Sequence, residues 1–456
     1  MKLFRKVTLF LFLFSSFSLF AQKESLEKKS GWNVIPLPVV SYNSDLGFQF
    51  GALATLYDFG DGSVYPDYKH RFYFELSMYT KMSGIAQMAY DSKYLIPGYR
   101  LTANLGFFPN KAYAFYGYNG YQSVFKPAFI DSDEALYRSR LFYNYQNYQV
   151  RFMADLQRNV TPWLKWIGGF NLWYFDLQSV DIDFLNRGKE ENLLPSVEEV
   201  PGLYDRYVAY GIIPHEEAEG GLVANLKLGI VADTRDYDSY PTKGVWTELL
   251  LNMAPGFIGN KNPHVKLVAM HRQYFPLVKK KLVFAYRLGY QGTIAGHAPF
   301  YMQSQLQTSF IYNLTNVAGG SKSVRGILYN RVLADGFLLG NAELRWRAVD
   351  FRFLGQNCFL GFNFFSDAAV TVQEIEYDRE AAMEKARAMA LESPTVWQFE
   401  ELDYFEFSTK DKPHFTVGGG LKFGFNENTI VSLDVGKALD ARDGNLGVYV
   451  AMDFLF

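Results

Sequence analysis

The sequence predicts an all-β fold, an antiparallel transmembrane β-barrel of sixteen strands with long extracellular loops. Three observations predict it: segments of alternating hydrophobicity, an excess of aromatic residues, and connections that alternate between short and long. Aromatic residues make up 18% and charged residues 20% of the 456 residues, whereas a bundle of membrane helices would need repeated runs of about 20 apolar residues. Membrane barrels carry aromatic belts at both interfaces, which explains the excess.

The N-terminal residues 1–21 predict a secretory signal peptide. Basic residues are followed by an apolar stretch from Leu9 to Phe14, and Ala21 suits the position before cleavage. A single membrane anchor is the alternative interpretation of this stretch. No cysteine follows it closely, which argues against a lipoprotein. We expect a short periplasmic tail at residues 22–32 and the outer-membrane barrel at residues 33–456.

Alternating segments recur along the chain. Between residues 341 and 348, the polar side chains Asn341, Glu343, Arg345 and Arg347 alternate with apolar ones. A soluble sandwich would not direct four successive polar positions into its core, but a membrane barrel with a wet interior would. A soluble sheet with one solvated face also alternates and is the alternative interpretation.

Sixteen segments of this kind can be counted, and an even number is the rule for bacterial barrels. They are expected at 33–43, 47–57, 68–79, 84–93, 99–108, 139–156, 162–178, 219–233, 244–253, 265–276, 282–294, 340–352, 358–370, 415–425, 429–436 and 447–456. Connections after even-numbered strands are mostly short, whereas four connections after odd-numbered strands are long: 109–138, 179–218, 295–339 and 371–414. Short periplasmic turns and long extracellular loops are typical of this architecture.

Two parts of this pattern carry further expectations. The last strand is expected to continue, alternating strictly, to the terminal residue Phe456. Residues 374–392, in the last long loop, are rich in helix formers and lack Gly and Pro, so they predict a helix outside the barrel. That helix is either a solvated surface helix or a lid over the pore.

Composition and motifs exclude several classes of function. Lysine and arginine number 45 against 47 acidic residues, so the chain has no basic surface to suggest a nucleic-acid partner. The single cysteine and the spacing of the six histidines give no metal-binding pattern, and no Gly-x-Ser-x-Gly is present. We expect that the chain is not an enzyme and that it binds no metal and no cofactor. An outer-membrane hydrolase with a catalytic triad dispersed in sequence is the alternative.

Two segments depart from the alternating pattern. The first is a turn between the eighth and ninth strands, with the candidate residues Asp233, Arg235, Asp236, Pro241 and Gly244. The second lies within the long connection before the twelfth strand, with the candidate residues Gly319, Gly320, Val324, Arg325 and Gly326. The turn reads Asp-Thr-Arg-Asp followed by Tyr-Pro-Thr-Lys-Gly, and the loop reads Gly-Gly-Ser-Lys-Ser-Val-Arg-Gly.

Both segments resemble the BamA/TamA outer-membrane assembly-factor superfamily, the bacterial surface antigen barrels. Members carry an Asp-Arg-Asp turn before Pro-x-x-Gly, and a Gly-Gly…Val-Arg-Gly motif on an extracellular loop that folds into the lumen. Further segments of this chain, at 361–367, 418–422, 433–436 and 36–42, are similar to the family's strands in the same order. Ile327 departs from the family, which usually has an aromatic residue there. The resemblance spans most of residues 33–456.

The resemblance implies a barrel of the Gram-negative outer membrane that assists the insertion or translocation of client proteins. Its partners would be outer-membrane lipid, clients, and a periplasmic helper protein. Members usually carry POTRA domains before the barrel, but only residues 22–31 stand there, so we expect a branch without POTRA domains. A specialised insertase or translocase then fits better than a general one. The alternatives are a gated or passive pore, and a structural or surface-interaction barrel.

Within the loop that folds inward, Arg325 would be a buried and permanently charged group that needs a carboxylate partner, preferably a bidentate one. Alternation places Asp367 on the lumen face. We predict an Arg325–Asp367 pair with Glu343 as a second acceptor. An exposed arginine on a mobile loop is the alternative.

The first strand carries Pro36 and Pro38, and positions two apart point their N–H groups to the same side. Since proline has no N–H, one edge of this strand lacks two donors. If that edge faces the last strand, then Pro36, Pro38 and Phe456 mark a weak seam that could serve as the lateral gate of the family. The alternative is that both prolines lie outside the membrane-spanning ladder.

Overall fold

The computed structural model describes residues 29–65, 67–237, 240–279, 281–310, 318–353, 356–408, 410–425, 429–452 and 454–456. The predicted signal peptide at 1–21 and most of the predicted tail at 22–32 lie outside the described residues.

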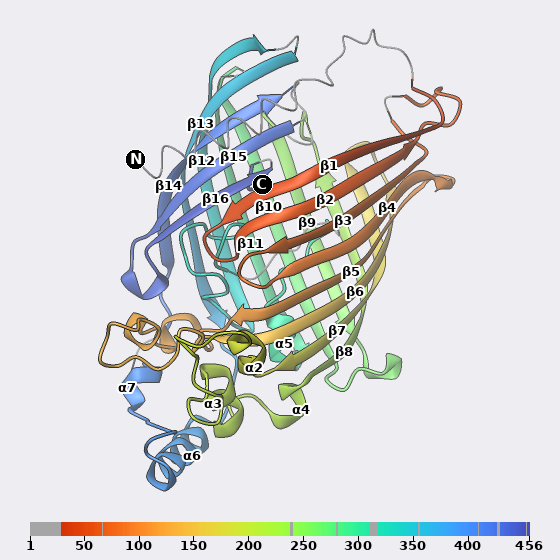
Figure 1. The fold of residues 1–456 in the computed structure, drawn as a ribbon. Helices are drawn as coiled ribbons and strands as arrows, with labels where there is room; N and C mark the ends of the chain where they lie inside the picture. Colours follow the sequence, from red (N-terminus) through yellow and green to blue (C-terminus); the bar gives the residue numbers. More distant parts are fainter. Residues whose placement is uncertain are drawn as a thin grey trace.

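Sixteen antiparallel strands form a closed barrel in which every strand pairs with its neighbour in sequence and β1 pairs with β16 (Figure 1). The predicted fold class is therefore confirmed. The strands are β1 Trp32–Asn43, β2 Gly47–Asp58, β3 His70–Tyr79, β4 Gly84–Ile96, β5 Tyr99–Ala114, β6 Asn144–Asn159, β7 Leu164–Gln178, β8 Gly220–Asp233, β9 Gly244–Ala254, β10 His264–Val278, β11 Leu282–Gly296, β12 Gly336–Phe353, β13 Gln356–Gln373, β14 His414–Phe425, β15 Thr429–Ala438 and β16 Leu446–Met452.

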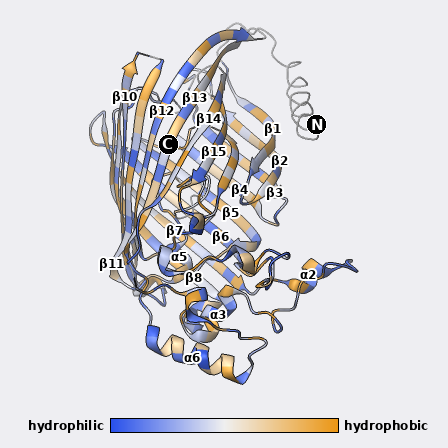
Figure 2. Cartoon of the chain, turned by 90° about the vertical axis from the view of Figure 1, so that its left-hand side faces the viewer, coloured by the Kyte–Doolittle hydropathy of each residue, from blue (hydrophilic) through white to orange (hydrophobic). Residues whose placement is uncertain are grey.

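Hydrophobic and hydrophilic residues alternate along the strands (Figure 2), and this alternation separates a lipid face from a polar lumen. On β8, the side chains of Leu222, Leu228 and Ile230 are exposed on the outside, whereas Lys227 is buried in the lumen and forms an ion pair of 2.8 Å with Asp155. A charge buried on the inner face is stabilised by such a partner. Within the described part of the chain, no helix is long and apolar enough to cross a membrane.

Short helices stand in the long connections, at the lower end of Figure 1. They are α2 Ile182–Asn186, α3 Leu203–Tyr210, α4 His215–Ala218, α5 Phe300–Gln303, α6 Arg379–Glu392 and α7 Glu401–Tyr404, with 3-10 turns η2 Gly120–Gln122, η3 Pro127–Phe129, η4 Gly256–Ile258 and η5 Ala441–Asp443. The predicted helix at 374–392 is α6. It begins after Asp378, whose carboxylate accepts a hydrogen bond from the N–H of Ala381 and caps the helix.

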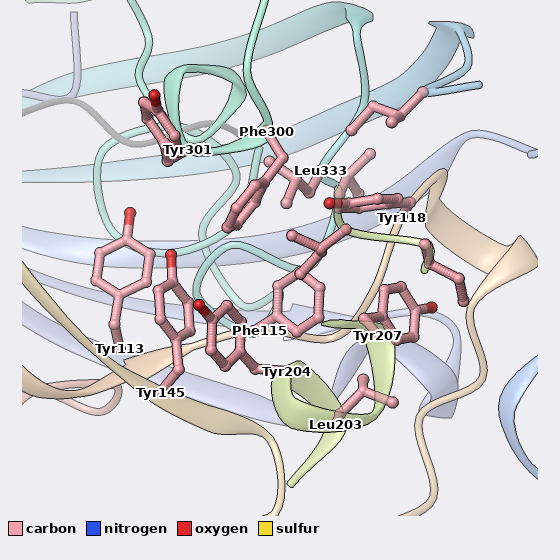
Figure 3. Packing of buried hydrophobic residues seen from close by; sticks show 14 of the residues in the cluster. Tyr113, Phe115, Tyr118, Tyr145, Leu203, Tyr204, Tyr207, Phe300, Tyr301 and Leu333 are labelled. Atoms are coloured by element: carbon pink, nitrogen blue, oxygen red, sulfur yellow. The ribbon is translucent and has the colours of Figure 1, made fainter. Parts of the chain in front are cut away.

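The long loops pack on one another through a cluster of buried aromatic side chains, here called the loop core (Figure 3). Phe115 meets Tyr207 edge to face at 5.1 Å between ring centres, and Tyr145 stacks on Tyr204 at 4.7 Å. Helix α6 contributes Ala382, Met383 and Ala386 to this core, so one face of the helix is buried. The loops therefore form a packed cap at one end of the barrel.

Several predicted strand limits need correction. The fifth strand was expected to end at residue 108 but extends to Ala114, because its pairing with β6 continues to that residue. The twelfth strand was expected from residue 340 but begins at Gly336, where it pairs with Gln373 of β13. The sixth strand was expected from residue 139 but begins at Asn144, because residues 139–144 form turns in which Phe142 N–H donates to Ser139 and Asn144 N–H donates to Leu141. The last strand was expected to reach Phe456 but ends at Met452. Residues 454–456 lie outside the strand ladder.

Candidate functional site

The described residues 318–335 of the connection between β11 and β12 form a segment that we call the inward loop. Val324, Arg325 and Ile327 within it are each at most 1% exposed. Gly319 adopts a φ of +130°, and a Cβ there would stand 2.3 Å from the carbonyl oxygen of Leu328. Only glycine fits this position without strain. The hydroxyl of Ser323 accepts a hydrogen bond from the N–H of Gly319 (3.0 Å), which closes the turn around Gly320.

Arg325 joins the inward loop to the barrel wall. Its Nε and Nη2 donate to the two carboxylate oxygens of Asp367 on β13, at 2.8 and 3.0 Å, so the pair is bidentate. Its Nη1 lies 2.7 Å from Glu343 Oε1 on β12 and 3.3 Å from Asp434 Oδ2 on β15. The guanidinium also lies 3.5 Å from the centre of the Phe365 ring.

The structure thus brings together three residues singled out in the sequence, Arg325, Asp367 and Glu343. Burial by itself lowers the pKa of the Arg325 guanidinium, but the surrounding carboxylates raise it above its usual value. Sequence reasoning missed Asp434, although it stands in a segment noted for the family resemblance. Alternation along β15, which also buries Ser432, was the available signal for a lumen-facing carboxylate.

Cations balance the three carboxylates. Arg345 donates to Glu343 Oε2 at 2.7 Å, and Lys422 donates to Asp434 Oδ1 at 2.7 Å. These groups are all buried in the lumen. The network therefore crosses four neighbouring strands, β12 to β15, and Arg325 is the member that the inward loop supplies.

Gly326 lets the inward loop approach the wall closely. Its φ is +97°, and a Cβ there would stand 2.6 Å from the carbonyl carbon of Gly436 on β15. Its N–H donates to the hydroxyl of Tyr449 on β16 at 3.0 Å. Two glycines thus permit direct backbone packing between loop and strand.

Arg331 anchors the C-terminal part of the inward loop. It was not singled out in the sequence. It is fully buried and donates to the carbonyl oxygens of Arg442, Gly120 and Ser123, each at 3.0 Å. These acceptors belong to two other extracellular connections. Main-chain acceptors leave no trace in the residue pattern, so no sequence signal could have found this contact.

The seam between β1 and β16 is short. Within the described residues, the register pairs Tyr42 with Val450 and Asn43 with Tyr449, and Ser44 N donates to Val448 O at 3.0 Å. By comparison, β15 and β16 pair at seven positions. The part of β1 from Trp32 to Ser41 extends beyond this pairing.

The direction of the β1 backbone groups follows from two hydrogen bonds at Gly31, whose N–H donates to Gly60 and whose carbonyl accepts from Phe59. Odd-numbered residues therefore bond to β2, and even-numbered residues face the seam. Pro36 and Pro38 are even-numbered and lie within β1, so the structure places both missing donors on the seam edge.

The terminal segment, Phe454–Phe456, lies in the lumen and not at the seam. Phe456 is buried against Tyr274 and Val283, on the wall formed by β10 and β11, so its assignment to the seam was wrong. The physical reason is Arg345, which donates to the Phe456 carbonyl oxygen at 2.7 Å. Its guanidinium also lies 4.2 Å from the ring centre of Phe454 and 4.8 Å from that of Phe456.

The turn between β8 and β9 is stabilised by hydrogen bonds between its own residues. Arg235 donates to Asp233 at 3.0 Å, and Asp236 accepts from the N–H of Thr242 at 2.8 Å. Pro241 is buried beside them, and Gly244 has a φ of +101°. The neighbouring Tyr240 packs its ring 5.4 Å from that of Phe454, so this turn also touches the terminal segment.

Among the described residues, no group of three or more His, Cys, Asp or Glu side chains is arranged to hold a metal ion. What the site contains instead is a loop, a seam and a terminal segment that are joined by buried ion pairs and main-chain contacts.

Residues 73–446 match the sequence model of the Omp85 superfamily domain. The structure is similar to BamA from Haemophilus ducreyi lacking POTRA domains 1–3, with a TM-score of 0.54, 14% identity, and coverage of 93% of this chain and 70% of that one. It is also similar to CdiB from Escherichia coli, with a TM-score of 0.54, 8% identity, and coverage of 94% of this chain and 63% of that one. These identities establish likeness of fold alone, and no curated protein sequence matches the chain.

Proposed function

The chain belongs to the Omp85 superfamily and is a β-barrel of the bacterial outer membrane, and from this premise we propose that it assists the insertion or translocation of other proteins there. Its proposed partners are outer-membrane lipid, client proteins with a strand to pair, and a periplasmic helper that delivers them. The proposal involves no catalytic step and no cofactor.

The half-paired seam is the observation that carries this proposal. Along β1, from Trp32 to Val39, the seam-facing backbone groups extend past the end of β16, because the register sets Met452 opposite Val40. A free strand edge is a template on which another extended chain can add by antiparallel pairing. Trp32 and Val34 offer both N–H and carbonyl groups there, whereas Pro36 and Pro38 offer carbonyl groups only.

The lumen face of β1 supports the same function. Ile35 and Leu37 point toward the barrel interior but are 42% and 43% exposed. Apolar side chains that stay exposed beside a free strand edge are typical of a surface that another chain covers.

A gated pore is the second candidate, because the lumen is lined with buried charged groups such as Lys227, Lys266 and Arg287. The inward loop occupies part of that lumen, so conduction would require the loop to move. Single-channel recording separates the two: a steady conductance that rises when Arg325 is replaced favours a pore.

A cross-linked barrel tests the insertion proposal. In a Cys358→Ser background, Ser41→Cys with Ala451→Cys would bridge β1 and β16, because the register of Asn43 with Tyr449 sets residue 41 opposite residue 451. The control pairs the same Ala451→Cys with Ser432→Cys, which joins β15 to β16 and leaves the seam free. We expect the seam bridge alone to deplete client proteins from the outer membrane, as gene deletion does, and a reductant to restore them. Unchanged client levels in both the bridged and the deletion strain would refute the proposal.

A further inference from the structure

Three side chains form a row across β5, β6 and β7, which lie side by side in the barrel (Figure 1). Arg158 of β6 pairs with Trp166 of β7, and Tyr99 of β5 stands opposite Arg158 because Arg100 pairs with Gln157. Nη1 of Arg158 donates to the hydroxyl of Tyr99 at 3.1 Å, and the guanidinium lies 5.2 Å from the centre of the Tyr99 ring. The rings of Tyr99 and Trp166 meet edge to face at 6.0 Å between centres.

This row is on the outer face of the barrel. Even-numbered side chains of β6 point outward, since Val150 and Phe152 are exposed to the lipid side, and Arg158 is exposed in the same way. Residues paired across neighbouring strands share a face, so Tyr99 and Trp166 point outward with Arg158. Arg158 stands one residue before the end of β6, at the end of the barrel opposite the loop cap.

The surroundings of the row are typical of a membrane interface. The turn that follows β6 adds the exposed side chains of Val160 and Trp163. The indole of Trp166 lies along the strand over Gly168, where a Cβ would stand only 3.3 Å from Cζ3 of the ring. Tyrosine and tryptophan on the outside of a barrel mark the level of the lipid head groups. The row therefore lies at the level of the inner leaflet's head groups.

The charge of Arg158 is not balanced by the protein. Among the residues that the structure describes, no carboxylate forms an ion pair with Arg158, whereas the lumen arginines Arg325 and Arg345 are both paired. A guanidinium has five N–H donors, and the hydroxyl of Tyr99 accepts from only one nitrogen of Arg158. An unpaired charge that faces a bilayer is costly unless it reaches the head-group layer. The planar fork of arginine matches the oxygens of a phosphate group.

We propose that Tyr99, Arg158 and Trp166 form a binding site for the phosphate group of a phospholipid in the inner leaflet of the outer membrane. Tyr99 orients the guanidinium, Arg158 binds the phosphate, and Trp166 packs against the glycerol and the start of the acyl chains. The exposed aromatic and apolar side chains at the same level favour a lipid over a free phosphate ion, because only a lipid would cover them. The site lies away from the seam and the inward loop, and it does not depend on the proposed function.

Native mass spectrometry of the purified full-length barrel in a maltoside detergent tests the site. Two lipids with the same acyl chains are compared, phosphatidylglycerol and the phosphate-free monogalactosyl diacylglycerol. We expect tighter binding of phosphatidylglycerol, and Arg158→Gln should lower its affinity about tenfold, because the charge-assisted hydrogen bonds are lost. Arg187→Gln, at an exposed arginine in the connection between β7 and β8, changes the net charge equally and should leave the affinity unchanged.

Quenching of tryptophan fluorescence by brominated acyl chains locates the bound lipid. Brominated phosphatidylglycerol should quench more strongly than the brominated galactolipid at equal concentration. This excess should be lost in Arg158→Gln and reduced in Trp166→Phe, which removes the reporter but keeps an aromatic ring. Trp346→Phe is the control, because Trp346 is also exposed on the outer face but belongs to β12, and the excess should persist there.

Three results would overturn the site. The first is equal affinity for phosphatidylglycerol in Arg158→Gln and the unaltered barrel. The second is equal binding of the two lipids, which would show contact with the chains alone. The third is displacement of phosphatidylglycerol by millimolar inorganic phosphate, which would identify a site for the free anion. Electrophoretic mobility checks the folding of each variant, and the comparison of the two lipids on the unaltered barrel needs no variant at all.

Discussion

Asn43 and Tyr449 face each other across the seam, and each of them also bonds to the inward loop. Asn43 Nδ2 donates to Ser321 Oγ at 3.1 Å, and the hydroxyl of Tyr449 accepts from the N–H of Gly326 at 3.0 Å. The loop therefore ties β1 to β16 at the end of the seam where the two strands pair. The anchoring of Arg325 and the closure of the seam are coupled through these contacts.

Replacing Tyr449 with Phe should loosen this end of the seam. The change removes the acceptor of the buried Gly326 N–H, and leaving such a donor without a partner costs about 1–3 kcal/mol. We expect the amide hydrogens of Ser44 and Val448 to exchange with deuterium about tenfold faster than in the unaltered barrel. Tyr42→Phe is the control, because that ring is on the outer face and 37% exposed. Equal exchange in both variants would show that the loop does not support the seam.

Arg325 should dominate the stability of the lumen network. Arg325→Ala leaves Asp367, Glu343 and Asp434 with too few cations, and breaking a buried pair costs about 3–5 kcal/mol. The stability of Arg325→Lys should lie between that of the unaltered barrel and that of Arg325→Ala, because lysine keeps the charge but cannot form the bidentate pair. The temperature at which folded mobility is lost in electrophoresis measures the order. Arg387→Ala, which breaks an exposed pair with Glu401, should change stability by less than about 1 kcal/mol.

Exchanging the two charges of the Arg325–Asp367 pair should restore only part of the stability that either single change removes. Arg325→Asp with Asp367→Arg restores one opposite pair but sets the new carboxylate beside Glu343 and Asp434. Like charges in a buried site oppose each other, so we expect only partial recovery over either single change. Full recovery would mean that Glu343 and Asp434 contribute little to the anchor.

The barrel and the lumen-facing position of Asp367 could be predicted from the sequence because both follow from local alternation. A lumen-facing carboxylate at Asp367 and a family motif at Arg325 suffice to expect their contact. The destination of Phe456 could not be predicted in the same way, because alternation is identical for a strand in the ladder and for one that leaves it. The deciding contact is with Arg345, which is distant from Phe456 in the sequence, and only the closed barrel brings the two residues together.

Gly244→Ala should destabilise the turn between β8 and β9. The residue has a φ of +101°, and its Cβ would stand 2.3 Å from the carbonyl oxygen of Thr234. Gly259 is a matched control, because its φ is +95° but no atom lies within 4 Å of the added Cβ. We expect about 1 kcal/mol of lost stability at Gly259 from backbone strain alone, and about 2 kcal/mol or more at Gly244, where the clash adds to it. Equal losses in thermal unfolding would remove the steric argument.

The loop cap should respond to pH through His297 and Glu217. His297 Nε2 lies 2.8 Å from Glu217 Oε1, and this hydrogen bond raises the pKa of His297 above its usual value. The contact therefore stabilises the folded state below the ordinary histidine pKa of about 6.5 and is lost as pH rises through the raised value. We expect the connection after β11 to be cleaved by protease more slowly at pH 5.5 than at pH 8.5. In His297→Gln this difference should shrink, and an undiminished difference would assign the pH response to other groups.

Arg331 should hold the extracellular cap together although it touches no part of the seam. Its guanidinium donates to carbonyl oxygens of Gly120, Ser123 and Arg442, and its Nε lies 3.6 Å from Asp443. Arg331→Lys keeps one charge but can reach only some of these acceptors, and each buried carbonyl left without a donor costs about 1–3 kcal/mol. We expect faster proteolysis in the connections between β5 and β6 and between β15 and β16, with the mobility of the folded barrel retained. Arg187→Lys, an exposed arginine in the connection between β7 and β8, should have no such effect. If both variants resist protease like the unaltered chain, the three carbonyl contacts do not stabilise the cap, and packing of the aromatic loop core suffices.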